Sequence, residues 1–165
     1  MTELPNLSLA RMDQMSLFHP VTSIDDLEQN GPQIYTTASG VELTRDTGQT
    51  SLDMGAGLWC VNVGYGRTKI AEAISKQAHE LAYYHAYVGH GTEASIRLSK
   101  MIIDRAPDHM SRVYFGLSGS DANETNVKLI WLYHNQIGKP EKKKIISRKR
   151  GYHASGLMTG SLTRL

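Results

Sequence analysis

The chain has 165 residues, of which 40% are hydrophobic and 21% charged, and its formal net charge is +2. This length is enough for one domain with a hydrophobic core, and so small a charge gives no argument for a nucleic-acid or membrane partner. Cys60 is the single cysteine, which excludes an internal disulfide and favours a cytoplasmic location. No signal peptide or membrane-spanning segment is expected, because every apolar run is short and interrupted.

Residues 1–30 are expected to form an irregular N-terminal arm, because their apolar side chains are scattered and such arms usually need a partner surface to become ordered. Residues 31–67 have the pattern of a β-meander that leads into a glycine-punctuated loop holding Trp59 and Tyr65. The three predicted strands of the meander cover residues 33–37, 41–45 and 50–53.

Residues 68–165 are predicted to begin an α/β domain. Two amphipathic helices are expected first, over residues 68–82 and 92–105. A short strand, a helix and a second strand follow, and together they would form one βαβ unit of a parallel sheet. These three elements are predicted at residues 112–116, 122–135 and 144–148.

The turn before the last of these helices, residues 117–121, has the composition of a phosphate-binding cradle. The first N–H groups of a helix have no partners inside the helix, and the helix dipole favours negative charge there. Gly119 would let a ligand approach the backbone, and Ser120 would add a hydroxyl donor. The turn alone also fits an ordinary strand-to-helix connection that is capped by Ser120.

Three segments carry the strongest pattern of the sequence, in this order along the chain: Gly57 to Arg67, Ser118 to Glu124 and Arg150 to His153. Together they resemble the class III, omega-type aminotransferases, which are fold-type I enzymes dependent on pyridoxal 5'-phosphate (PLP). The resemblance runs from about His19 to the last residue. It implies the N-terminal portion of the fold-type I transferase fold, with residues 31–67 in the small-domain region and residues 68–165 at the start of the PLP-binding large domain.

The resemblance implies a set of cofactor-binding residues. Gly119 and Ser120 match the phosphate cup, where the backbone N–H groups of both residues and of Asp121 would donate to phosphate oxygens while the Asp121 carboxylate points away. Tyr152 matches the aromatic residue that stacks on the PLP ring, and His153 would help to shape the pocket. Without the cradle, Tyr152 could equally be a surface tyrosine.

The resemblance also implies a substrate pocket. Leu58, Trp59 and Tyr87 match positions that line the amine pocket, and Val21 would reach the same mouth. Aromatic walls of this kind favour apolar or aromatic amines. Without the resemblance, the simpler interpretation of Trp59 is core packing.

The implied activity is transfer of an amino group from an amine or omega-amino acid to a keto acid such as pyruvate. The family needs a Schiff-base lysine and a carboxylate at the ring nitrogen, and no lysine of this chain stands in the matching context. Class III enzymes are also much longer than this chain. We therefore expect an N-terminal portion that is inactive alone and that belongs to a homodimer in the full-length enzyme.

Two other functions remain open at the level of sequence: a non-catalytic phosphate- or nucleotide-binding module, and a dimerisation fragment. The basic residues between 142 and 150 do not indicate a nucleic-acid site, because Ile145 and Ile146 interrupt the charges and no aromatic platform accompanies them. The histidines and Cys60 show no metal-ligand spacing, so no metal site is expected.

Overall fold

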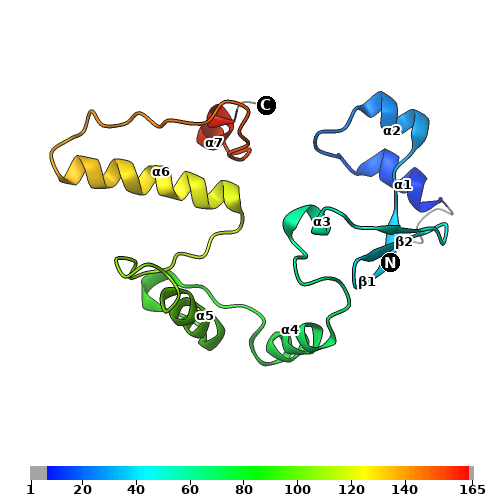
Figure 1. Ribbon diagram of the computed structural model, residues 1–165, viewed down its shortest axis with the longest axis horizontal. Helices are drawn as coiled ribbons and strands as arrows, with labels where there is room; N and C mark the ends of the chain where they lie inside the picture. The colour runs from blue at the N-terminus through cyan, green and yellow to red at the C-terminus, as the bar shows by residue number, and fades with distance from the viewer. Residues whose placement is uncertain (1–6, 164–165) are drawn as a thin grey trace. The chain divides into compact units, whose positions relative to one another are not determined.

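The computed structural model describes residues 7–163, and the chain divides into two compact units, Met1–Tyr84 and His85–Leu165. Figure 1 shows the elements of both units in chain order. The predicted domain boundaries concern a larger fold than either unit and stay a prediction.

The N-terminal arm is not irregular, as the sequence pattern suggested, but contains two short helices, α1 (Leu9–Ser16) and α2 (Ile24–Asn30). A serine caps each of them. The side chain of Ser8 accepts a hydrogen bond from the third amide of α1 (3.2 Å), and that of Ser23 accepts one from the third amide of α2 (3.4 Å). These caps satisfy amides that a helix leaves unpaired, which explains why such short segments become helical.

The predicted β-meander is confirmed as a three-stranded antiparallel sheet in the order β1-β2-β3. The strands are β1 (Tyr35–Ser39), β2 (Glu42–Arg45) and β3 (Thr50–Leu52). The turn between β1 and β2 also holds a distant residue, because Gly40 and Tyr65 exchange two backbone hydrogen bonds of 3.1 and 2.8 Å. The sheet therefore anchors the loop that follows it.

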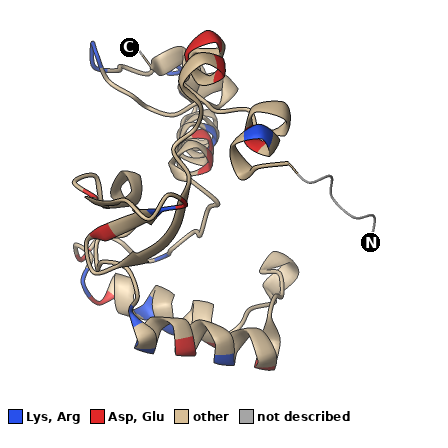
Figure 2. Ribbon diagram, turned by 90° about the vertical axis from the view of Figure 1, so that its right-hand side faces the viewer, with Lys and Arg blue, Asp and Glu red and all other residues tan. Residues whose placement is uncertain are grey.

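The sheet is followed in the first unit by the short turn α3 (Ala56–Trp59) and the helix α4 (Thr68–Leu81). The helix confirms the prediction for residues 68–82. Lysine and glutamate alternate along it, as the blue and red bands in Figure 2 show, and Lys76 pairs with Glu80 four residues later (3.8 Å). Such exposed pairs add only a few tenths of a kcal/mol each, roughly 0.3–0.5.

Between His85 and Thr163, the second unit contains a short 3₁₀ turn and three helices. The predicted helix over residues 92–105 is confirmed as α5, which Thr92 and Ser95 cap by hydrogen bonds between each side chain and the other's amide, both 3.3 Å. The elements are η1 (Tyr87–Gly89), α5 (Glu93–Ile103), α6 (Gly119–Gln136) and α7 (Leu157–Leu162).

The structure differs from the prediction at the two segments expected to be parallel strands. Residues 112–116 and 144–148 belong to no sheet within the described part of the chain. A strand is regular only where a neighbour accepts and donates its backbone hydrogen bonds, and the apolar pattern cannot supply that neighbour. Ile146, expected in the strand core, is accordingly 97% exposed. The indole of Trp131 on α6 donates to the carbonyl of Lys143 (3.0 Å) and so holds the start of the second segment.

Among residues 7–163, few side chains are buried, and these lie where α6, α7 and the loop between them meet. Val127 and Ala154 are 6% and 5% exposed, and Thr159 is fully buried. Most large apolar side chains on the other helices are exposed. In the same range, no helix is long and apolar enough to cross a membrane.

Candidate functional site

The predicted phosphate cradle lies at the first turn of α6, which begins at Gly119 rather than at the predicted residue 122. The cap is Ser118, not Ser120: the Ser118 hydroxyl accepts a hydrogen bond from the amide of Asp121 (3.2 Å). The carboxylate of Asp121 turns back and accepts from the amide of Leu117 (3.0 Å). The amide and the carboxylate of Asp121 are therefore both hydrogen-bonded within the turn.

Two amides of the cradle remain available. Those of Gly119 and Ser120 donate to no group of the described chain, as expected at the start of a helix. The Ser120 hydroxyl oxygen accepts from the amide of Ser155 (3.3 Å), so its own hydrogen is free to donate. These three donors lie where the helix dipole is positive, an arrangement that can bind an anion such as a phosphate group.

The loop that carries Tyr152 is tied to this end of α6. Besides the Ser155 contact, the side-chain amide of Asn123 donates to the carbonyl of His153 (3.0 Å). The amide of His153 in turn donates to the hydroxyl of Thr163, just after α7 (3.0 Å). The Tyr152 side chain is 63% exposed. The structure thus brings the loop holding both predicted ring-binding residues against the first two turns of the cradle helix.

The backbone of this loop is strained. Arg150 and Ala154 have φ angles of 58° and 115°, in the left-handed region that residues with a Cβ avoid. A Cβ on Gly151 would lie 2.8 Å from Nε2 of His153 and 3.1 Å from the carbonyl oxygen of Arg148, so a larger residue there would displace one of them. That nitrogen is buried and has no hydrogen-bond partner in residues 7–163. A buried, unpaired ring nitrogen in a strained loop is a feature often found at binding sites.

Glu124 fixes the far side of the same loop. One of its carboxylate oxygens accepts hydrogen bonds from the amides of Met158 (2.9 Å) and Thr159 (3.0 Å) and from the Thr159 hydroxyl (3.3 Å). The amide of Thr159 and these further donors hold the pKa of Glu124 below its ordinary value. A Cβ on Gly156 would run into this carboxylate. Glu124 on α6 therefore caps the start of α7 from another part of the chain.

The predicted substrate residues Leu58 and Trp59 lie in an unusual turn in the first unit. All four residues of α3 have positive φ, from 48° at Ala56 to 67° at Trp59, so the segment is one turn of a left-handed helix. Such backbone costs roughly 1–2 kcal/mol for each residue that carries a Cβ. Both side chains project outward, Leu58 being 75% and Trp59 77% exposed. Core packing of Trp59 is not found in the part of the chain that the structure describes.

Asp53 holds this left-handed turn. Its Oδ1 atom accepts from the amide of Gly55 (3.0 Å), and its Oδ2 atom accepts from the amide of Gly57 (2.6 Å) and the hydroxyl of Tyr65 (2.7 Å). The hydrogen bond from Tyr65 is the main cause that holds the pKa of Asp53 below its ordinary value, and it raises the pKa of Tyr65. A Cβ on Gly57 would lie 2.7 Å from a methyl group of Val61.

The other two predicted substrate residues are also exposed. Val21, with a φ of 56°, lies between α1 and α2, and its side chain is fully exposed. Tyr87 lies in η1 and belongs to the second unit, whereas Leu58 and Trp59 belong to the first. Each therefore remains a separate prediction for the pocket.

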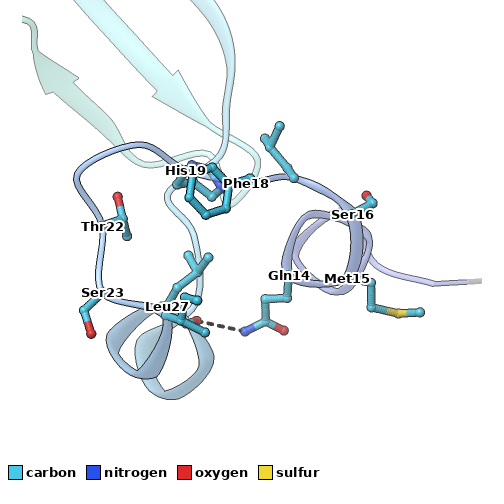
Figure 3. Close-up of a pocket in the computed structure, with 10 residues that line it drawn as sticks. Gln14, Met15, Ser16, Phe18, His19, Thr22, Ser23 and Leu27 are labelled. Atoms are coloured by element: carbon cyan, nitrogen blue, oxygen red, sulfur yellow. Dashed lines mark hydrogen bonds between the residues drawn. The ribbon is translucent and has the colours of Figure 1, made fainter. Parts of the chain in front are cut away.

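A hollow of about 260 Å³ lies between α1 and α2 (Figure 3). The side-chain amide of Gln14 bridges the two helices by donating to the carbonyl of Leu27 (3.0 Å), shown as a dashed line in Figure 3. His19 and Asp13 also pair at 2.8 Å on its border. Its lining includes Phe18 but none of the predicted site residues. Across residues 7–163, no group of histidine, cysteine and carboxylate side chains could hold a metal ion.

Two carboxylates that position these loops were absent from the sequence-based prediction. Asp53 had a local signal, because an Asp two residues before a glycine often accepts from the backbone ahead of it. Glu124 had no such signal, since its partners lie 34 and 35 residues further on. Only the fold brings them together.

Comparison with known proteins matches residues 24–164 to the class-III aminotransferase family. The diaminobutyrate–2-oxoglutarate transaminase of Halomonas elongata is 48% identical over 155 residues, which are 93% of this chain and 33% of that protein. An omega transaminase from Pseudomonas jessenii, solved in complex with PMP, superposes with a TM-score of 0.93 at 36% identity over 96% of this chain and 35% of that one. A tryptophan-to-glycine variant of a thermostable omega transaminase, engineered for synthesis of enantiopure bulky amines, gives a TM-score of 0.92 at 37% identity over the same shares.

This chain thus spans about a third of the length of the relatives that it matches, and it corresponds to their N-terminal portion. The match extends over most of the chain, both in sequence and in structure. The chain belongs to the class III aminotransferase family, and its fold is that of the N-terminal portion of a fold-type I enzyme.

Proposed function

We propose that this chain provides the phosphate cradle and part of the amine pocket of a PLP-dependent aminotransferase. The enzyme would move an amino group from an amine or omega-amino acid to a keto acid such as pyruvate. The observation that carries the proposal is the pair of unpaired amides of Gly119 and Ser120, with a free hydroxyl hydrogen beside them, at the start of α6. This donor set suits the phosphate of PLP.

Each binding residue has one task in this proposal. The amides of Gly119 and Ser120 and the Ser120 hydroxyl donate to phosphate oxygens, and the exposed ring of Tyr152 stacks on the cofactor ring. His153 supports that loop through its backbone contacts to Asn123 and Thr163. Asp121 contributes the structure of the turn, because its amide and carboxylate already have partners. Once bound, PLP would supply the electron sink that lets the substrate carbon lose its proton.

The substrate pocket is proposed to include Leu58, Trp59, Tyr87 and Val21. All four side chains are exposed and apolar or aromatic, which suits an apolar or aromatic group on the amine. The engineered thermostable omega transaminase supports this, because there a tryptophan was replaced by glycine for the synthesis of enantiopure bulky amines. We therefore propose that Trp59 limits the size of the amine.

We further propose that the 165-residue chain is inactive alone, since no lysine in it stands in the context of the family's catalytic lysine. The exposed apolar helix faces would be covered by the rest of a longer enzyme and by a second subunit of a homodimer. A cytoplasmic location is proposed from the single cysteine, which suits a reducing compartment.

The test is amino transfer from an arylalkyl amine to pyruvate, assayed in the protein at the length made by its source. We expect turnover that depends on added PLP and a PLP–lysine adduct that borohydride fixes covalently. The 165-residue chain, purified separately, should show no turnover. A native-length protein that binds a nucleotide in preference to PLP, or that associates without binding either, would contradict the proposal.

A further inference from the structure

We infer that Asp53 and Tyr65 are positioning residues that set the amine preference of this enzyme, because they hold the left-handed turn that presents Leu58 and Trp59. The inference rests on the proposed role of those two side chains in the amine pocket. Neither Asp53 nor Tyr65 would touch the reacting atoms.

The backbone of the turn is unfavourable by itself. Four consecutive residues with positive φ do not persist unless their surroundings enforce them. The carboxylate of Asp53 supplies that enforcement, because one oxygen takes the amide of Gly55 and the other takes the amide of Gly57. These two amides lie just before and inside the left-handed segment.

The Asp53 carboxylate is also connected to the sheet. The amide of Asp53 donates to the carbonyl of Val41, the residue just before β2 (2.8 Å). The hydroxyl of Tyr65 donates to the same carboxylate oxygen as Gly57, and the backbone of Tyr65 is bound twice to Gly40 between β1 and β2. The turn is therefore tied to the β-meander from both sides, through Asp53 and through Tyr65.

The turn presents two exposed side chains. Leu58 and Trp59 are about three-quarters exposed, and no hydrogen bond or ring contact fixes the Trp59 indole within the described residues. Their direction thus follows from the backbone that Asp53 and Tyr65 hold. A change of φ at any residue of the turn would redirect the Trp59 ring and alter which amines fit against it.

Two conservative substitutions test the inference in the native-length holoenzyme. Asp53→Asn keeps the shape but replaces one acceptor oxygen with a donor, and Tyr65→Phe removes only the hydroxyl. The readout is the ratio of kcat/KM for 1-phenylethylamine to that for 2-aminopropane. We expect Asp53→Asn to lower this ratio about tenfold and Tyr65→Phe about threefold, mostly through KM of the aromatic amine. The matched controls Asp46→Asn and Tyr35→Phe, at exposed positions of the same sheet region, should leave the ratio unchanged.

A double-mutant cycle separates positioning from general damage. In a Trp59→Ala background, Asp53→Asn should no longer change the ratio, because the ring that it positions is gone. An equal loss of kcat/KM for both amines, or the same change of ratio in both backgrounds, would overturn the inference. If Asp53→Asn does not fold, the same cycle with Tyr65→Phe decides the question.

The proposed function and this inference fail in different ways. Wild-type protein without PLP-dependent turnover would overturn the proposed function and, with it, the inference that rests on it. Wild-type turnover with normal PLP content in every variant, but an unchanged amine ratio in Tyr65→Phe and Asp53→Asn, would leave the function standing and overturn the inference.

Discussion

Two carboxylates hold the two loops that are proposed to meet ligands, and they work over different distances in the sequence. Asp53 accepts hydrogen bonds from residues two, four and twelve positions later, all within the first unit. Glu124 accepts from residues 34 and 35 positions later, at the start of α7 in the second unit. The local clamp enforces an unfavourable backbone turn, whereas the distant one joins two helices. A loop can therefore be held from within or from a neighbouring element.

The comparison implies that the Asp53 turn is the more sensitive of the two to a change inside it. We expect Gly57→Ala to lower the free energy of unfolding by about 3 kcal/mol, because the new methyl group would meet Val61 at 2.7 Å and the Tyr65 hydroxyl at 3.0 Å. Urea unfolding of the native-length protein measures this. The control is Gly48→Ala, which has a similar positive φ but open space around its Cβ, and should cost only about 1 kcal/mol. Equal losses in the two variants would show that contacts around Gly57 are unimportant.

The Glu124 clamp is expected to depend on its buried partner. Thr159 is fully buried, and its hydroxyl both donates to Glu124 (3.3 Å) and accepts from the amide of Gly156 (3.1 Å). Thr159→Val keeps the volume but removes both hydrogen bonds, and should cost about 1–3 kcal/mol in unfolding free energy. The exposed Thr47→Val serves as the control and should change stability by less than about 0.5 kcal/mol. A Thr159→Val protein as stable as wild type would mean that the clamp acts without the hydroxyl.

Two serine variants separate capping from ligand binding at the cradle. Ser118→Ala removes the cap of α6 and should lower the unfolding free energy by about 1 kcal/mol. Ser120→Ala should instead weaken PLP binding about tenfold, because its hydroxyl is proposed to face the phosphate. Thermal unfolding measures the stability of both variants, and a PLP titration measures the affinity of both for PLP. The opposite assignment, with Ser120→Ala destabilising the fold more, would contradict the observed cap.

The smallest expected effect is on pH dependence. The pKa of Glu124 lies below its ordinary value because the charged form accepts the amide of Thr159. A group of this kind contributes stability that is complete above its unfolded pKa and is lost as the pH falls through its folded pKa. Between about pH 6 and pH 3, wild type should therefore lose more unfolding free energy than Glu124→Gln. If wild type and Glu124→Gln lose the same unfolding free energy as the pH falls, the Glu124 carboxylate does not form these hydrogen bonds in solution. The exposed Glu80→Gln, as a control, should follow wild type.

The elements that the sequence predicted well depend on local patterns. The β-meander, α4 and α5 follow from alternating or helical spacing of apolar residues and from nearby glycine turns. The helices α1 and α2 could have been predicted too, since Ser8 and Ser23 stand where helix caps are preferred. The scattered apolar residues around them concealed that signal.

The elements that the sequence predicted wrongly depend on partners. Residues 112–116 and 144–148 have apolar patterns typical of strands, but no neighbouring strand pairs with them in the described chain. The alternative interpretation of the turn, an ordinary connection capped by Ser120, names the wrong serine, because serines flank Gly119 on both sides and the cap is Ser118. The resemblance located the candidate site residues, whereas Glu124 needed the fold.

The central claim is that the first turn of α6 binds the phosphate of PLP. The most direct measurement is the dissociation constant of PLP for the native-length protein, followed by absorbance, with and without inorganic phosphate as competitor. The account predicts that phosphate competes with PLP, that Ser120→Ala weakens binding about tenfold, and that Ser75→Ala on the exposed face of α4 leaves it unchanged. PLP binding that is insensitive to phosphate and equal in all three proteins would contradict it.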